Sequence, residues 1–176
     1  GAGYASSGWM GVAAGTYHFT GQMDEVALYE RTMSAATVKK HYAARSALIT
    51  GDSAHYRGEI VGDAPAAYWP LDENKGATTA VSRVTAAQGN GTYVNATAGT
   101  TGIFGTGDGQ AVQLSGTGAV SVPGNLVAGT TDLTAELWFN TTKSGVLLGF
   151  QNAALGATPT SWRPALNIDE AGKLRG

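Results

Sequence analysis

The stretch FTGQMDEVALYERTMSAATVKKHY, residues 19–42, passes from a strand pattern into a helix pattern, and the rest of the fold is organised around it. Successive side chains of a β-strand point to opposite faces. The alternation therefore predicts a strand with Met23, Glu25, Ala27 and Tyr29 on one face, and Asp24, Val26, Leu28 and Glu30 on the other. Neither set is uniformly apolar, so we expect the strand to be partly covered on both faces.

A short helix is expected directly after this strand. Ser34 can accept hydrogen bonds from the free N–H groups that begin residues 35–42. Val38 and Tyr42 are four residues apart, so they share one side of that helix. His41 falls near the expected end of the helix, where we assign it a structural role.

A second helix is predicted over residues 53–62, with Asp52 as its cap and Pro65 beyond its end. From residue 66 onward the chain shows short apolar runs separated by Gly, Asn, Asp and Thr. Runs with this spacing predict an all-β fold, an antiparallel β-sandwich or jelly roll with short connecting helices. The expected strands are 66–71, 91–94, 110–116, 119–124, 133–140, 145–151 and 164–169, with an earlier one at 8–13.

Composition excludes several classes of protein. The 176 residues carry a net charge of −2 with 14% charged residues and no basic cluster, so no nucleic-acid partner is expected. No apolar run approaches the roughly 18–20 residues that span a bilayer, so membrane insertion is not expected. The chain has no cysteine, which excludes disulfides and thiolate metal sites.

Three ordered motifs resemble the laminin-G-like, concanavalin-A-type jelly-roll domains that occur in tandem in large secreted bacterial proteins. The closing motif of that family matches Phe19, Gly21, Met23, Asp24, Glu25, Val26, Tyr29, Ser34, His41 and Tyr42. The opening motif matches Pro65, Tyr68, Trp69, Leu71, Asp72, Glu73, Gly91, Thr92 and Tyr93, and a later Glu-x-Trp matches Glu136 and Trp138. The resemblance implies a concanavalin-A-like fold and an extracellular or cell-surface location.

The closing motif precedes the opening motif, so the resemblance implies pieces of two domains. Residues 1–46 are expected to end a first domain, residues 47–64 to form a helical connector, and residues 65–176 to begin a second domain. Neighbouring domains of the same polypeptide would then be partners. The alternative is that the two parts fold together and complete one permuted sandwich.

The resemblance also implies a structural calcium ion. Related jelly rolls bind calcium through an Asp of the last strand and oxygen atoms near the first strand, positions that Asp24, Asp72 and Asn74 occupy here. The alternative for Asp24 is a solvated strand residue, or a carboxylate that accepts hydrogen bonds from backbone N–H groups.

A ligand site is expected on residues 133–140. Trp138 and Glu136 share one face of this strand, while Leu133, Ala135, Leu137 and Phe139 form the core face. Trp138 can stack on a sugar ring, with Glu136 or Asn140 bonding its hydroxyl groups. The alternative, which we favour, is that Trp138 packs inside the protein.

A second ligand candidate lies in residues 158–164, which are expected to form a loop. Trp162 and Arg163 can contact a ligand there, or Trp162 can pack against a neighbouring domain.

No catalytic residues are predicted. A retaining glycosidase needs two carboxylates about 5–5.5 Å apart, whereas Asp24 and Glu25 alternate in direction and Glu136 has no acidic neighbour on its strand. The expected function is a non-catalytic module that binds carbohydrate or another surface protein within a larger adhesin, toxin or enzyme. A structural spacer in a multidomain array is the alternative, and a fragment of a jelly-roll glycoside hydrolase is less favoured.

Overall fold

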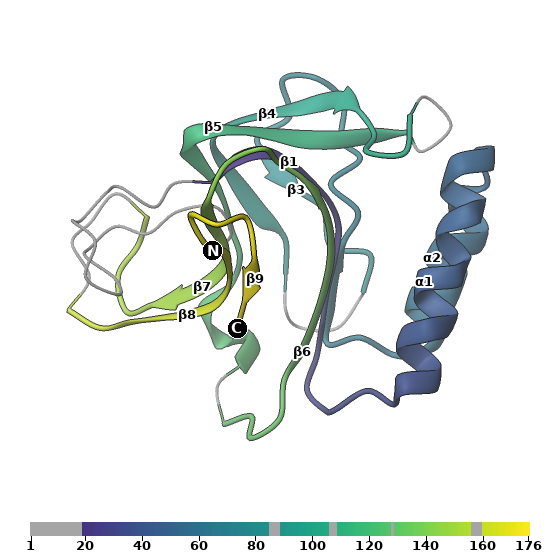
Figure 1. Cartoon of the computed structure of the whole chain (residues 1–176), viewed down its shortest axis with the longest axis horizontal. Helices are drawn as coiled ribbons and strands as arrows, with labels where there is room; N and C mark the ends of the chain where they lie inside the picture. The colour runs from purple at the N-terminus through teal and green to yellow at the C-terminus, as the bar shows by residue number, and fades with distance from the viewer. Residues whose placement is uncertain (1–18, 85–88, 106–108, 128, 156–159) are drawn as a thin grey trace.

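The computed structural model describes residues 19–84, 89–105, 109–127, 129–155 and 160–176; the strand expected at 8–13 lies outside them. Most of these residues form antiparallel β-sheet, and two α-helices follow the first strand (Figure 1). The elements are β1 (Thr20–Tyr29), α1 (Ala35–Thr50), α2 (Ser53–Gly62), β2 (Ala67–Trp69), β3 (Thr79–Ala80), β4 (Gly91–Thr101), β5 (Gln110–Ser121), the 3-10 helix η2 (Gly124–Val127), β6 (Thr134–Asn140), β7 (Gly145–Gln151), β8 (Trp162–Ile168) and β9 (Leu174–Arg175).

The centre of the main sheet is β1. It pairs with β2 and β5 along one edge and with β6 along the other, and β4 and β3 follow β5. In Figure 1, β1 and β6 run side by side as long curved strands, and the sheet is nearly closed. The strand predicted from residues 19–30 therefore lies among strands that come from residues 67–140.

A β-bulge changes the predicted alternation of β1. The register with β6 shifts between Asp24 and Ala27, and Glu25 has a positive φ of 51°. An extra residue in one strand reverses the face of every residue beyond it. Met23 consequently shares a core with Val26 and Leu28, and the prediction that Met23 lies on the same face as Ala27 and Tyr29 is wrong.

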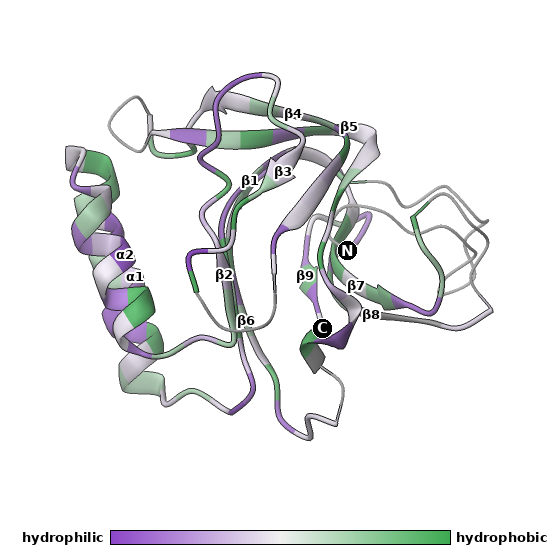
Figure 2. Cartoon of the chain, turned by 180° about the vertical axis from the view of Figure 1, so that it is seen from behind, coloured by the Kyte–Doolittle hydropathy of each residue, from purple (hydrophilic) through white to green (hydrophobic). Residues whose placement is uncertain are grey.

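The two faces of the main sheet are covered differently. On one face, α1 and α2 bury Ala27 and Tyr29 against residues such as Leu48, Tyr56 and Ile60. On the other face the three-stranded sheet β7–β8–β9 contributes Leu147, Leu148 and Ile168 to the larger core. Figure 2 shows hydrophilic and hydrophobic segments mixed along both helices, as expected for a layer with one buried side.

Both predicted helix starts are confirmed. The Ser34 side chain accepts a hydrogen bond from the Thr37 amide, and the Asp52 side chain accepts one from the His55 amide. α1 is longer than the predicted 35–42, because residues 43–49 are compatible with a helix. The helix ends before Gly51, which adopts the left-handed conformation that glycine favours at helix C-termini.

Among the predicted strands, 145–151 matches β7, whereas 110–116 and 119–124 join as the single strand β5. The loop predicted at 158–164 is wrong in its C-terminal part, because β8 begins at Trp162 and pairs with β7. Within β8, only Asn167 and Ile168 pair with β9. In the described chain, one edge of β8 at Pro164 therefore has no strand partner. Proline is tolerated at such an edge because no strand there needs its missing N–H group. No described helix is both long and apolar enough to span a membrane.

Candidate functional site

A buried histidine joins the helical layer to the main sheet. His41 of α1 is 1% exposed, and each of its ring nitrogens faces a carboxylate. Nδ1 lies 2.8 Å from Oε2 of Glu136 on β6, and Nε2 lies 2.8 Å from Oδ2 of Asp63, the residue that caps α2. An imidazole donates to two carboxylates at once when both ring nitrogens carry a proton.

Glu136 collects further hydrogen bonds from the same layer. The Tyr29 and Tyr56 hydroxyls donate to its two oxygens over 3.4 and 3.2 Å, and the Trp138 indole N–H donates to the Tyr56 hydroxyl over 2.8 Å. Burial, followed by the charge of Glu136, raises the pKa of both tyrosines above the ordinary range. The network links β1, α1, α2 and β6, and the carboxylate of Glu136 is its centre.

The outer end of the network carries ion pairs. Lys40 lies 2.6 Å from Glu59 and 3.6 Å from Asp63. The hydrogen bond from His41 lowers the pKa of Asp63, and the charge of Lys40 acts in the same direction. The helix pair is thus held to the sheet by a continuous polar chain.

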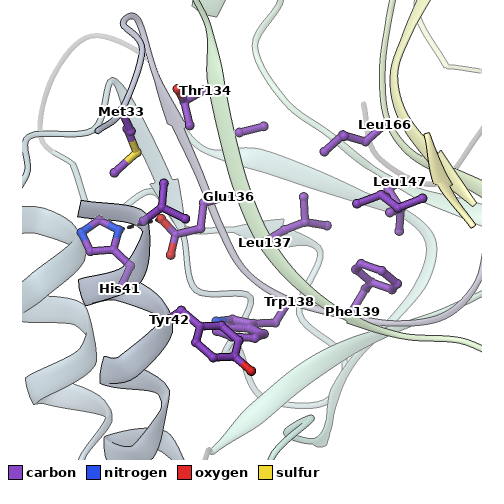
Figure 3. Close-up of a pocket in the computed structure, with 13 residues that line it drawn as sticks. Met33, His41, Tyr42, Thr134, Glu136, Leu137, Trp138, Phe139, Leu147 and Leu166 are labelled. Atoms are coloured by element: carbon purple, nitrogen blue, oxygen red, sulfur yellow. Dashed lines mark hydrogen bonds and ion pairs between the residues drawn. The ribbon is translucent and has the colours of Figure 1, made fainter. Parts of the chain in front are cut away.

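A pocket of about 480 Å³ lies beside this network. One wall comes from the α1 side, with Met33, Val38, His41 and Tyr42, and the opposite wall has Leu147, Leu166 and Leu174. Figure 3 shows β6 between these walls, with Glu136 directed toward His41 and with Leu137 and Phe139 directed toward Leu147. The remaining lining residues are Thr134, Ala135, Glu136, Leu137, Trp138 and Phe139, all of β6.

The structure brings two of the predicted ligand residues, Glu136 and Trp138, to this pocket. Trp138 packs edge-on against Phe104, with ring centroids 4.9 Å apart, and lies 5.9 Å from the Tyr42 ring. Asn140 sits at the exposed end of β6 and does not line the pocket. The core face predicted for this strand is confirmed for Ala135, Leu137 and Phe139, which pack against the larger core, whereas Leu133 lies before the start of β6.

The other predicted ligand residues, Trp162 and Arg163, lie in β8 and pair through their backbones with Gln151 and Phe150. Their side chains lie outside the described part of the chain.

The predicted calcium ligands are engaged in other contacts. Asp72 lies 2.9 Å from Arg57 and 3.1 Å from Arg83, and two guanidinium groups at one carboxylate disfavour a cation there. Asn74 accepts a hydrogen bond from Gln110, and Asp24 is buried in β1. Among the residues that the structure describes, no three His, Cys, Asp or Glu side chains are grouped to hold a metal ion.

Sequence reasoning missed His41, Asp63 and Tyr56 as parts of the site. His41 was assigned to a helix end, but α1 continues for nine residues beyond it, to Thr50, so His41 is an interior helix residue on the buried side. No local pattern connects residues 41, 63 and 136, because their proximity depends on the packing of the helices on the sheet.

We find no match for this chain among family models, curated proteins or solved structures.

Proposed function

We propose that this chain is a non-catalytic binding module whose ligand is another polypeptide, bound in the pocket between α1 and β7–β9. The observation that carries the proposal is the lining of that pocket. Of its thirteen residues, nine have purely apolar side chains or the indole of Trp138, and the polar groups come from His41, Tyr42, Thr134 and Glu136. Apolar pockets with few polar groups bind apolar side chains, and a sugar requires many more hydrogen-bond partners.

The arrangement of Trp138 favours a polypeptide over a carbohydrate. Its indole N–H is bonded to Tyr56, and its ring contacts both the Phe104 ring and the Tyr42 ring. An aromatic residue that stacks on sugars needs a free face. Glu136 and His41 bind each other, so their polar groups are also engaged within the protein.

The proposal includes a jelly-roll sandwich of the laminin-G-like type, within a larger secreted or cell-surface protein. It is supported by the antiparallel sheet and by a second sheet that shares its core. A calcium ion bound through Asp24 stays a prediction, which the effect of calcium and of a chelator on the melting temperature would test.

Parallel screens against a glycan array and a displayed peptide library test the proposed function. We expect selected peptides to bind saturably, and Val38→Glu in the pocket wall to abolish binding. Ile49→Glu is the matched control, because Val38 and Ile49 are 52% and 55% exposed on the same helix and only Val38 lines the pocket. Glycan binding that Trp138→Ala abolishes would replace the proposal with a carbohydrate-binding module, and no binding in either screen would favour a spacer.

A further inference from the structure

The pocket follows the edge of β6 that lies opposite β1. It is lined by every residue from Thr134 to Phe139, six in succession. Successive side chains of a strand point to opposite faces, so a pocket over one face would touch every second residue. A pocket that touches all six runs along the edge of the strand, where the backbone N–H and C=O groups point outward.

This edge has no strand partner within the described chain, since β6 pairs with β1 and with no other described strand. Proteins protect sheet edges by keeping the edge strand short, or by placing Lys or Pro in it. β2 and β3, the other strands at the edges of the main sheet, have three and two residues, whereas β6 has seven and contains neither Lys nor Pro. The β6 edge is long, and its single charged residue, Glu136, is paired with His41.

Apolar side chains flank the edge on both sides. Val38 and Tyr42 of α1 are 52% and 55% exposed, and Leu174 of β9, across the pocket, is 55% exposed. The core-facing residues Ala135, Leu137 and Phe139 of β6 are themselves only partly buried. The larger core is therefore open along this strand, between two apolar walls.

We propose that the β6 edge accepts one extended strand of another polypeptide, which hydrogen-bonds to β6 and places its side chains alternately against α1 and against β7–β9. The proposal rests on the proposed function and specifies the form of its ligand. Backbone hydrogen bonds supply affinity in such strand addition, and side-chain pockets supply specificity. Six residues of edge extend about 20 Å, enough for a strand of ordinary length.

The two walls of the pocket leave room for a single added strand but not for a second copy of this chain. A second β6 would carry its own α1 on one face and its own β7–β9 on the other. These layers would meet the same layers of the first copy, where Tyr42 and Leu174 already border the edge. A lone strand brings no such layers and fits between the walls.

The walls also specify the side chains of the strand. Those directed toward Leu137, Leu147 and Leu166 enter an apolar space that suits Val, Ile or Leu. Those directed toward Val38, Tyr42 and the Glu136–His41 pair meet a mixed surface that suits Thr. An alternating Thr-Val sequence satisfies both sides.

The test uses a fluorescent peptide, acetyl-KTVTVTVTK-amide, and the same peptide N-methylated at its seven central residues. The methylated peptide keeps the side chains, but its seven central residues have no N–H groups to donate to β6. We expect the first peptide to bind the wild-type chain saturably and the methylated one not to bind. Val38→Glu and Leu174→Glu should each weaken binding at least about tenfold, or about 1.4 kcal/mol, and Ile49→Glu should leave it within about twofold. All three positions are exposed, so we expect the variants to fold, and melting curves test this.

The possible negative results of this test contradict different parts of the two proposals. Equal binding of the methylated peptide would overturn strand addition while leaving polypeptide binding in place. If Ile49→Glu weakens binding as much as Val38→Glu does, the ligand binds outside the pocket, and both proposals are wrong. If neither peptide binds but library peptides occupy the pocket, strand addition is wrong and the proposed function stands. A dimer in light scattering that Val38→Glu dissociates would make the occupant a second copy.

Discussion

Nδ1 of His41 lies 2.8 Å from Oε2 of Glu136, although 95 residues separate the two in the chain. This contact joins α1 to β6, and its continuation to Asp63 brings in the end of α2. It also positions the pocket, since Tyr42 follows His41 directly and Val38 lies one turn before it. The polar network thus holds one wall of the pocket beside the edge of β6.

Removing the central histidine should destabilise the fold strongly. His41→Ala leaves the Glu136 carboxylate without its closest partner in a largely buried place, which we expect to lower the free energy of unfolding by about 2–3 kcal/mol. Urea denaturation measures the change. His55→Ala is the control, because the His55 side chain is exposed and its Nε2 lies 3.9 Å from the Glu59 carboxylate. Equal losses in the two variants would contradict a structural role specific to His41.

Acid should weaken the same network through Asp63. The hydrogen bond from His41 holds the pKa of Asp63 below its ordinary value, so the unfolded chain takes up a proton at this position first, near pH 3.9. The stability that Asp63 supplies is therefore complete above that pH and is lost as the pH falls through the lower folded pKa. Asp63→Asn should make the urea midpoint less dependent on pH between about 5 and 2.

A double-mutant cycle provides the control for this pH effect. Because the hydrogen bond from His41 is the largest cause of the lowered pKa of Asp63 and Lys40 adds to it, Asp63→Asn should reduce the pH dependence less in the His41→Ala background than in the wild-type chain. An additive change in the double variant would show that Asp63 acts through other groups.

Alkali should destabilise the fold because four buried tyrosines must lose their protons. Burial raises the pKa of Tyr29, Tyr56, Tyr68 and Tyr93, and neighbouring Glu136, Glu25 and Glu73 raise it further. The unfolded chain loses these protons near pH 10, so stability should fall as the pH rises above that value. Absorbance at the phenolate band should show these four ionising together with unfolding. Gradual ionisation of all tyrosines in a chain that stays folded would contradict this assignment.

Gly21 is expected to tolerate no side chain. A Cβ there would overlap the carbonyl oxygen of Asn140 and lie 2.9 Å from the Phe19 ring, at the place where β1 meets β6. Gly21→Ala should cost about 1–3 kcal/mol of stability. Gly58→Ala is the matched control, because open space surrounds Gly58 in α2, and alanine should stabilise that helix by about 0.5–1 kcal/mol. Thermal denaturation compares them, and a neutral Gly21→Ala would contradict the close approach of the two strands.

Local patterns predicted much of this fold because their causes are local. The cap residues Ser34 and Asp52 begin helices as expected, and the apolar run 145–151 is a strand. The bulge at Glu25 could not be predicted, because it depends on the register with β6, more than 100 residues away. For the same reason the sequence placed Glu136 and Trp138 on a common face but could not reveal that His41 and Tyr56 would meet them there.

Residue-resolved hydrogen exchange along β6 tests the central claim, an open strand edge held beside α1, most directly. In the free chain we expect amide protection to alternate over residues 134–140, with slow exchange where an N–H points to β1 and fast exchange where it points into the pocket. The Thr-Val peptide should then protect the fast amides. Uniform protection in the free chain would show that the edge is already covered, and fast exchange throughout would contradict the pairing of β6 with β1.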